Sequence, residues 1–269
     1  MIIDFHTHVY PPKAAHKAVA NIGDYYGVPV RGRGTLDELL EVGKRAGIDK
    51  FVLLPAAEAA EQVRRINDYI AGLCKAHDEL IGFGALHPDM PNAGEEVDRL
   101  IALGLRGIKI HGEFLRVNID DDRMMKLYAL LEGKLPVVFH MGNYRTTYSH
   151  PARLPPVLEA FPKLTVVAAH FGGWLLFDLA LECLRHTSCY VDLSSASEFI
   201  GLTRMEELIA LYGARRVLFG SDYPMFNPQE ELATFGKLRL SDGDRELILC
   251  QNALRLLSGN EAPGGSGKP

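Results

Sequence analysis

Two histidines that lie two residues apart stand close to the N-terminus, in the run Asp4-Phe5-His6-Thr7-His8. The run follows the apolar residues Met1–Ile3 and is predicted to form the end of a first β-strand. Successive side chains of a strand point to opposite faces, so the imidazoles of His6 and His8 share one face. Two imidazole nitrogens on one face can bind one metal ion, at about 2.0–2.1 Å in the case of zinc. A His-x-His pair alone also fits two ordinary polar residues at a strand end. Further possible ligands at the ends of other strands are needed to distinguish a metal site from this alternative.

Further histidine, lysine and aspartate side chains lie at the ends of other predicted strands. The predicted strands cover residues 2–5, 50–55, 80–87, 107–111, 136–140, 164–170, 190–194 and 216–222. Each segment is short and almost entirely apolar, which is typical of parallel strands that are buried on both faces. The polar residues at or beside their ends are His6, His8, His87, Lys109, His111, His140, His170 and Asp222. Residues from both ends of the chain would therefore meet at one edge of a parallel sheet.

Helical patterns separate the predicted strands. The segment 35–46 begins with Thr35 as an N-cap and Glu38 three residues later, a capping-box pattern, and it ends at Gly47. The other helical segments are 58–77, 92–103, 121–131, 151–160, 173–185, 204–212 and 241–257. Eight strands that alternate with helices predict an α/β protein, a single-domain (β/α)8 TIM barrel. An open doubly wound sheet is the alternative, although no G-x-G-x-x-G run follows the first strand.

The predicted barrel domain covers residues 1–258. Residues 259–269, which include Gly-Gly-Ser-Gly, are expected to form a disordered tail. The long stretch 9–34 after the first strand contains Tyr25, Tyr26 and three prolines, and we interpret it as a lid over the strand ends.

Length and composition favour a globular enzyme. The chain has 269 residues, a normal length for a single barrel, with 47% hydrophobic and 23% charged residues. Its net charge of -5 argues against a general nucleic-acid-binding protein, which needs a basic face. No apolar run approaches the roughly 20 residues of a membrane helix and no signal peptide is visible, so a cytoplasmic protein is expected. The four cysteines form no Cys-x-x-Cys pair and are predicted to be free thiols of a reducing compartment.

In a (β/α)8 barrel the active site lies at the carboxyl ends of the strands, where these polar residues are predicted. Imidazole and carboxylate ligands suit zinc, and also iron or manganese. A catalytic metal site keeps one position for water and lowers the pKa of that water towards about 7. A neighbouring carboxylate or imidazole can then accept the proton. The residue types therefore indicate a divalent metal site at the mouth of the barrel.

Five sequence blocks resemble the amidohydrolase superfamily. The blocks are Asp4-Phe5-His6-Thr7-His8, His140-Met141-Gly142, Ala169-His170-Phe171-Gly172-Gly173, Tyr190-Val191-Asp192-Leu193-Ser194 and Phe219-Gly220-Ser221-Asp222-Tyr223-Pro224. They are most similar to the amidohydrolase-related branch, which includes aminocarboxymuconate semialdehyde decarboxylase. His-x-His alone is a weak signal, whereas the five blocks in this order are a specific one, and the resemblance covers residues 1–257.

The resemblance implies a (β/α)8 barrel that holds one catalytic divalent metal ion, most often zinc. On the matching positions, His6, His8 and His140 would be metal ligands. Asp222 would be a further ligand or would orient the metal-activated water. His170 would help to deprotonate that water or polarise the substrate. Dimers are common among the relatives, so a homodimer is one assembly to expect.

Lys109 has two interpretations. In relatives with two metal ions, a carboxylated lysine at the end of the fourth strand often bridges them. We favour the alternative, in which one metal ion is bound and the Lys109 ammonium binds a substrate carboxylate as a point charge. The expected residues that bind a small, carboxylate-bearing substrate are Lys109, His111, Arg116, Arg145 and Trp174. Asp192 is expected to form hydrogen bonds inside the barrel rather than to bind the metal ion.

Three functions are compatible with these residues. The leading one is a metal-dependent hydrolase that uses metal-activated water on a small ester, lactone or amide. The alternative is a non-oxidative, metal-dependent decarboxylase of a small unsaturated or aromatic carboxylic acid. Some decarboxylases of this branch have Glu in place of the first His, so His6 weakly favours hydrolysis. The third is a binding or scaffold protein with a structural metal site, which the complete set of ligand residues argues against.

Overall fold

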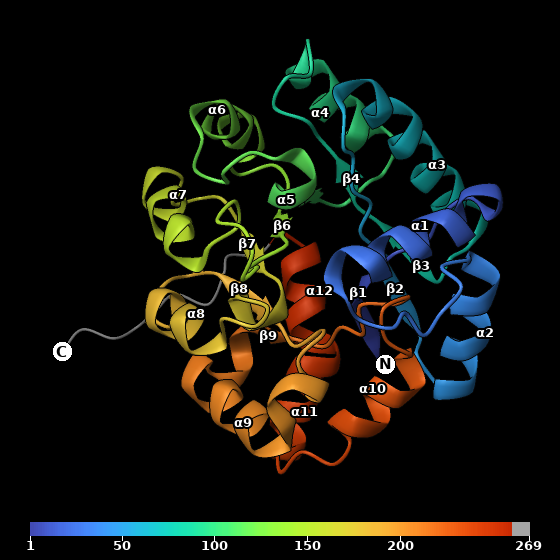
Figure 1. Ribbon diagram of the computed structural model, residues 1–269, viewed down its shortest axis with the longest axis vertical. Helices are drawn as coiled ribbons and strands as arrows, with labels where there is room; N and C mark the ends of the chain where they lie inside the picture. Colours follow the sequence, from blue (N-terminus) through green and yellow to red (C-terminus); the bar gives the residue numbers. More distant parts are fainter. Residues whose placement is uncertain (260–269) are drawn as a thin grey trace.

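The computed structural model describes residues 1–259 as a barrel of parallel strands within a ring of helices (Figure 1). The strands are β1 (Ile3–Thr7), β2 (Lys50–Leu53), β3 (Leu80–Gly82), β4 (Gly84–Ala85), β5 (Ile108–Ile110), β6 (Val137–Phe139), β7 (Val166–Ala168), β8 (Tyr190–Asp192) and β9 (Val217–Leu218). Residues 260–269, which make up nearly all of the segment expected to form a tail, lie outside the described residues.

The strands form two parallel hydrogen-bonded sets, β1-β2-β3 and β4-β5-β6-β7-β8-β9. The predicted strand 80–87 is divided between these sets at Phe83. The N–H of Phe83 donates to the carbonyl of Leu53 at the end of β2. The N–H of the next residue, Gly84, donates instead to the carbonyl of Gly107, just before β5. One apolar segment therefore gives two short strands because its hydrogen-bond partner changes after Phe83.

The ring closes between the first and the last strand. The N–H of Phe5 donates to the carbonyl of Phe219 at 2.8 Å. A parallel bridge pairs Thr7 with Tyr223 further along the same seam. With β3 and β4 sharing one place in the ring, the strands occupy the eight positions of a (β/α)8 barrel, and this prediction is confirmed.

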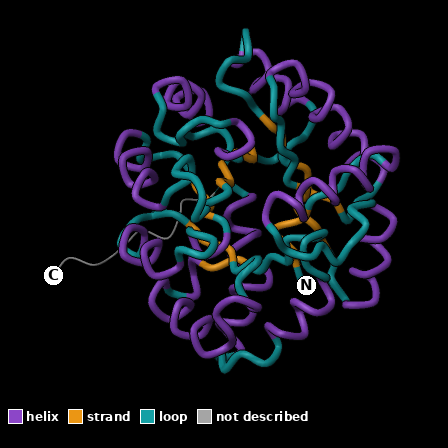
Figure 2. The backbone as a smooth tube through the Cα atoms, viewed as in Figure 1, coloured by secondary structure: helices purple, strands orange, loops and turns teal. Residues whose placement is uncertain are grey.

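Most helices surround the strands on the outside, whereas the last one lies in the middle of the ring in this view (Figure 2). They are α1 (Pro12–Tyr26), α2 (Leu36–Ala46), α3 (Val63–Ala76), α4 (Ala93–Ala102), α5 (Gly112–Leu115), α6 (Asp122–Leu131), α7 (Leu154–Ala160), α8 (Phe177–Leu184), α9 (Ser197–Tyr212), α10 (Pro228–Phe235), α11 (Asp242–Glu246) and α12 (Asn252–Leu257). α2 ends where predicted, at Gly47, which adopts a left-handed φ of 75°. Within residues 1–259, no helix combines the length and the apolar character needed to cross a membrane.

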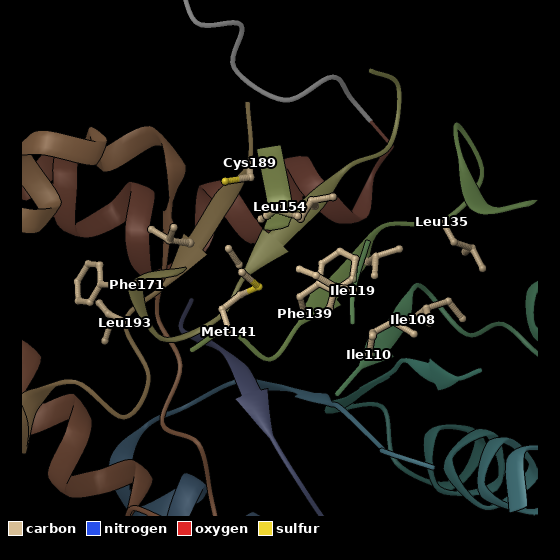
Figure 3. Packing of buried hydrophobic residues seen from close by; sticks show 14 of the residues in the cluster. Ile108, Ile110, Ile119, Leu135, Phe139, Met141, Leu154, Phe171, Cys189 and Leu193 are labelled. Carbon is tan, nitrogen blue, oxygen red and sulfur yellow. The ribbon is translucent and has the colours of Figure 1, made fainter. Parts of the chain in front are cut away.

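Alternate side chains of the strands separate an outer apolar region from the interior of the barrel. On β5, Ile108 and Ile110 belong to the outer cluster together with Phe139 of β6 and Leu154 of α7 (Figure 3). Burying each such side chain stabilises the fold by about 1.5–3 kcal/mol. Lys109 lies between the two isoleucines, so its side chain points to the opposite, inner face of the strand. The alternation of side-chain direction along β5 therefore places apolar residues in the outer core and Lys109 in the interior of the barrel.

Candidate active site

A cavity of about 670 Å³ opens at the carboxyl ends of the strands. Of the residues predicted for the site, those that line it are His6, His8, Lys109, His111, Arg116, His140, His170, Trp174 and Asp222. Arg145 lies at the exposed surface instead, where its guanidinium donates to the carbonyl of Tyr25 and to the hydroxyl of Tyr144. Arg145 therefore braces the end of α1 from outside and does not line the cavity.

A bulge in β1 directs both N-terminal histidines into this cavity. The register between β1 and β2 shifts between Asp4 and Thr7. Phe5 packs inside the barrel, and yet the next residue, His6, lines the cavity together with His8. Bulges re-aim side chains in this way beside active sites. The two imidazole centroids lie 5.1 Å apart, on the same side as expected.

Asp222 reaches the cavity from the loop that follows β9. Its backbone adopts a positive φ of 62°, and its N–H donates to the carbonyl of His6 at 2.8 Å. Gly220 makes this close approach feasible, because a Cβ at this position would lie 2.7 Å from the Cβ of His6. The first and the last strand thus bring their polar residues together.

His6, His8 and Asp222 form a cluster of electron-pair donors. The Nδ1–H of His6 donates to Asp192 Oδ2 at 2.8 Å, which leaves a lone pair on Nε2. The Nδ1–H of His8 donates to the carbonyl of Leu54, which leaves its Nε2 in the same state. The Nε2 atoms of His6 and His8 lie 3.5 Å and 3.1 Å from Asp222 Oδ1. Three groups with converging lone pairs suit a divalent cation, and the tethered Nδ1 atoms are the arrangement that metal-ligating histidines show.

Asp192 supports this cluster from inside the barrel, as predicted. It is completely buried, and its Oδ1 accepts hydrogen bonds from the backbone N–H of His170 at 3.0 Å and from the hydroxyl of Ser194. The Nδ1 of His170 lies 2.9 Å from the same Ser194 hydroxyl. Although burial opposes its ionisation, the neighbouring His6 holds the pKa of Asp192 well below its usual range. Asp192 therefore orients two imidazoles as a buried carboxylate.

Lys109 adds a positive charge beside the cluster. Its side chain is buried, and Nζ lies 3.3 Å from His6 Nε2. Burial lowers the pKa of Lys109 to about 8, with Asp192 and Asp222 opposing the shift. Burial and the charge of Lys109 together lower the pKa of His6 to about 3, so this imidazole is neutral at physiological pH. A neutral imidazole is the form that binds a metal ion.

His140 lies next to the cluster rather than within it. Its Nδ1 is 3.0 Å from His170 Nε2, and the centroid of the His170 ring lies 4.8 Å from that of His140 and 5.0 Å from that of His6. Within residues 1–259, the sets whose ligand atoms all lie within 4.8 Å of one another are His6–His8–Asp222, His6–His170–Asp192 and His111–Glu113–His140. The structure thus joins three of the four expected ligands closely and places His140 at their edge.

Two residues of the site carried no recognisable motif. Tyr26, on α1 in the segment interpreted as a lid, lines the cavity and places its hydroxyl 2.9 Å from His111 Nε2. In Figure 1, α1 runs from the outer ring toward the middle of the barrel. Glu113 of α5 is buried beside His111. It continues the alternation Lys109-x-His111-x-Glu113, which is the one signal in the sequence that points to it.

With this geometry established, comparison with known proteins gives the family. Residues 3–259 match the family model described as amidohydrolase. The chain belongs to the amidohydrolase family. The resemblance carried by the five sequence blocks is thereby confirmed, and the protein is an enzyme of a metal-dependent superfamily, with groups of residues that could hold a metal ion at the mouth of its barrel.

Solved structures share the fold of this amidohydrolase-family chain over nearly its whole length. An uncharacterized TIM-barrel protein from Bordetella bronchiseptica matches with a TM-score of 0.78 at 22% identity, covering 96% of this chain and 98% of that one. A 2,6-dihydroxybenzoate decarboxylase from Rhizobium matches with a TM-score of 0.76 at 18% identity, covering 96% and 98%. A 5-carboxyvanillate decarboxylase from Novosphingobium aromaticivorans, complexed with manganese and 4-hydroxy-3-methoxy-5-nitrobenzoic acid, matches with a TM-score of 0.72 at 17% identity, covering 96% of each chain. At these identities the likeness establishes the fold.

Proposed function

We propose that this amidohydrolase-family protein is a metal-dependent decarboxylase that removes CO2, without oxidation, from a small aromatic or unsaturated carboxylic acid. The observation that carries the proposal is the combination of aromatic walls with a buried ammonium group in one cavity. The aromatic lining residues are Tyr10, Tyr25, Tyr26, Phe114, Trp174 and Phe226. Flat rings favour a flat, apolar ligand body, and the Lys109 ammonium favours a carboxylate on it. Two proteins of similar fold, decarboxylases of dihydroxybenzoate and carboxyvanillate, support the same substrate class.

The metal ion would be held by His6, His8 and Asp222, with His140 as the fourth expected ligand. Bound there, a divalent ion supplies positive charge that stabilises negative charge developing on a substrate oxygen. Zinc is the ion expected from the sequence, and manganese suits the same imidazole and carboxylate ligands. Manganese is also the ion in one decarboxylase of similar fold. One ion per chain is proposed, and Lys109 is then free to act on the substrate.

The residues of the chain would carry the remaining steps. Lys109 would pair with the substrate carboxylate, while the aromatic walls keep water away from it. A carboxylate without its hydration shell is destabilised relative to neutral CO2. As the C–C bond breaks, CO2 leaves and the electron pair stays on the substrate carbon, which then takes a proton. We assign that proton transfer to His170, which would take up a proton from solvent at Nε2 while Ser194 holds its Nδ1–H, and would then pass this proton to the substrate carbon.

Hydrolysis of a small ester, lactone or amide is the second candidate. It is favoured by His6, the residue that some decarboxylases of this branch replace with Glu. In that reaction Asp222 would accept a proton from the attacking water, and His170 would polarise the carbonyl group. The two candidates use nearly the same residues, so the products must distinguish them.

The test is a product assay on metal-replete protein with aromatic acids, unsaturated acids, lactones, esters and amides. CO2 release that disappears in His6→Ala and after chelation supports the decarboxylase. Lys109→Met should raise the KM for the acid, whereas Lys126→Met, at an exposed position on α6, should not. Cleavage of a lactone, ester or amide without CO2 release would assign hydrolysis instead. Metal-loaded protein that turns over neither class would refute both candidates.

A further inference from the structure

Two buried polar atoms beside the metal-binding cluster have no hydrogen-bond partner among residues 1–259. They are Nδ1 of His111 and Oε2 of Glu113, and they lie 3.5 Å apart. The two side chains are 8% and 0% exposed, respectively. A buried polar atom without a partner is costly, so each of these atoms requires an explanation. The simplest is that a small shift joins them in a hydrogen bond, with the proton on Nδ1 of His111.

The surroundings of Glu113 make its free oxygen an acceptor. The other oxygen, Oε1, accepts hydrogen bonds from the N–H of Ser149 at 3.2 Å, from the hydroxyl of Ser149 at 2.6 Å and from the hydroxyl of Thr146 at 3.3 Å. Burial raises the pKa of Glu113, and the three donors on Oε1 oppose this shift and favour the charged carboxylate. The N–H of Ser149 is a donor that cannot reverse its direction, and it fixes which side of the carboxyl group must accept.

His111 is held rigidly between two rings. Phe114 stacks on one face of the imidazole, with centroids 3.7 Å apart and planes 4° apart. His140 stacks on the other face, at 4.1 Å and 6°. A nitrogen binds a metal ion in the plane of its own ring, and two stacked parallel planes share no such point. His111 and His140 therefore do not form a second metal site with Glu113, although their ligand atoms lie close together.

The geometry instead supports a chain of hydrogen bonds in which every donor points toward Glu113. We call it the Glu113 chain. It consists of Glu113, His111, Tyr26 and His140. If His111 donates from Nδ1 to Glu113, its Nε2 must accept the hydroxyl proton of Tyr26, which lies 2.9 Å away. The Tyr26 oxygen then accepts from Nε2–H of His140 at 3.3 Å. The chain ends with a lone pair on Nδ1 of His140.

A second set of hydrogen bonds reaches the same point from the other side. Asp192 accepts the hydroxyl proton of Ser194, and the Ser194 oxygen accepts from Nδ1–H of His170 at 2.9 Å. This leaves a lone pair on Nε2 of His170, which lies 3.0 Å from Nδ1 of His140. Two lone pairs that face each other at this distance suit a neighbouring cation. Both sets of hydrogen bonds thus leave a lone pair on the same side of the site, one on Nδ1 of His140 and one on Nε2 of His170.

We infer that Glu113 sets the tautomer of His140, through His111 and Tyr26, so that Nδ1 of His140 presents its lone pair to the metal site. Glu113 is on this account a positioning residue that touches neither the metal ion nor the substrate. Because Tyr26 belongs to α1, the arrangement is complete only when this helix covers the cavity. The inference rests on the proposed role of His140 as a ligand, and it does not depend on which reaction follows.

Glu113→Gln is the decisive variant because it has the same shape and reverses the chain. The amide oxygen must face the N–H of Ser149, so the amide NH2 must donate to Nδ1 of His111. Each bond then reverses, and Nδ1 of His140 carries the proton. We expect NMR of metal-free protein with isotopically labelled histidine nitrogens to show His140 changing from the Nε2–H to the Nδ1–H tautomer. Metal affinity, measured by chelator competition, should fall about ten- to hundredfold.

The matched control is Glu96→Gln, at another buried glutamate, on α4, whose oxygens accept hydrogen bonds from Asn67 and Arg99. It should leave the tautomer of His140 and the metal affinity unchanged. Tyr26→Phe cuts the chain, so Glu113→Gln should weaken metal binding no further in a Tyr26→Phe background. If the Glu113→Gln protein folds poorly, Tyr26→Phe alone still tests the inference, because this variant should abolish the tautomer preference of His140.

An unchanged His140 tautomer in folded Glu113→Gln protein would overturn the inference. A loss of metal affinity that persists in the Tyr26→Phe background would do so as well. The NMR measurement uses neither metal nor substrate, so its result is separate from the function. A tautomer change in a protein that releases no CO2 would leave this inference standing while the proposed function fails.

Discussion

Glu231 on α10 is a buried carboxyl group whose ionisation should cost folding free energy. The residue is 6% exposed, and each of its oxygens lies 3.0 Å from the hydroxyl of Ser197. Burial raises the pKa of Glu231 to about 7, although the hydrogen bond from Ser197 opposes the shift. Glu231→Gln keeps an acceptor for Ser197 and removes the titration. The variant therefore isolates the free energy of ionising one buried group.

The pKa values of Glu231 in the folded and the unfolded protein determine whether stability rises or falls with pH. The folded protein keeps this proton up to a pH of about 7, whereas the unfolded chain releases it near the ordinary value of 4.5. The native state thus binds more protons in this window, and the stabilisation present below pH 4.5 is lost as the pH rises through 7. The interval of about 2.5 pH units corresponds to about 3.4 kcal/mol. Glu231→Gln should exceed the wild type in stability by up to this amount at about pH 8, and by less than about 1 kcal/mol at about pH 5.

The assay is urea unfolding of both proteins at these two pH values. Other groups titrate over the same range, but they are common to both proteins and cancel in the difference. Glu182→Gln, at an exposed position on α8, is the control and should show no pH-dependent difference from the wild type. A stability difference between Glu231→Gln and wild type that is the same at both pH values would refute the reasoning.

Three further predictions concern the proposed metal ligands His6, His8 and Asp222. His6→Ala should lose bound metal, measured per chain by plasma mass spectrometry, together with turnover; full metal content would show that the ligand assignment is wrong. Asp192→Asn removes the acceptor that holds Nδ1–H of His6, so metal affinity by chelator competition should fall about ten- to hundredfold, and an unchanged affinity would contradict this role. Gly220→Ala would place a Cβ 2.7 Å from that of His6, so the thermal midpoint and the metal content should both fall, whereas Gly243→Ala, with its nearest neighbour at 3.9 Å, should change neither.

The barrel and most of the cavity lining could be predicted because they depend on local patterns. Short apolar runs such as 107–111 mark buried parallel strands, and the fold then brings their carboxyl ends together. Lys109 and His111 line the cavity for this reason. The division of the predicted strand 80–87 at Phe83 was missed, because hydrogen-bond partners are set by neighbouring strands rather than by the segment itself.

The parts of the site that the sequence did not reveal depend on contacts between distant segments. Tyr26 lies on α1, and the strand pattern does not predict where this helix packs. Its role in the site follows only from the distance between its hydroxyl and His111. Arg145 was expected in the cavity because it follows a strand, but its long side chain turns to the backbone of Tyr25. Glu113 lies on a four-residue helix, where strand alternation gives no firm direction for a side chain.

The closing seam of the barrel has a consequence for how the protein is made. His8 and Asp222 are separated by 214 residues, so the ligand cluster cannot exist until the last strand has left the ribosome and found the first. The seam itself is held by few backbone hydrogen bonds, one of them between Phe5 and Phe219. A metal ion bound by residues from both sides of this seam would hold the first and the last strand together. Metal loading and ring closure are then one linked equilibrium, and metal starvation during synthesis should expose this seam to proteases before any other part of the barrel.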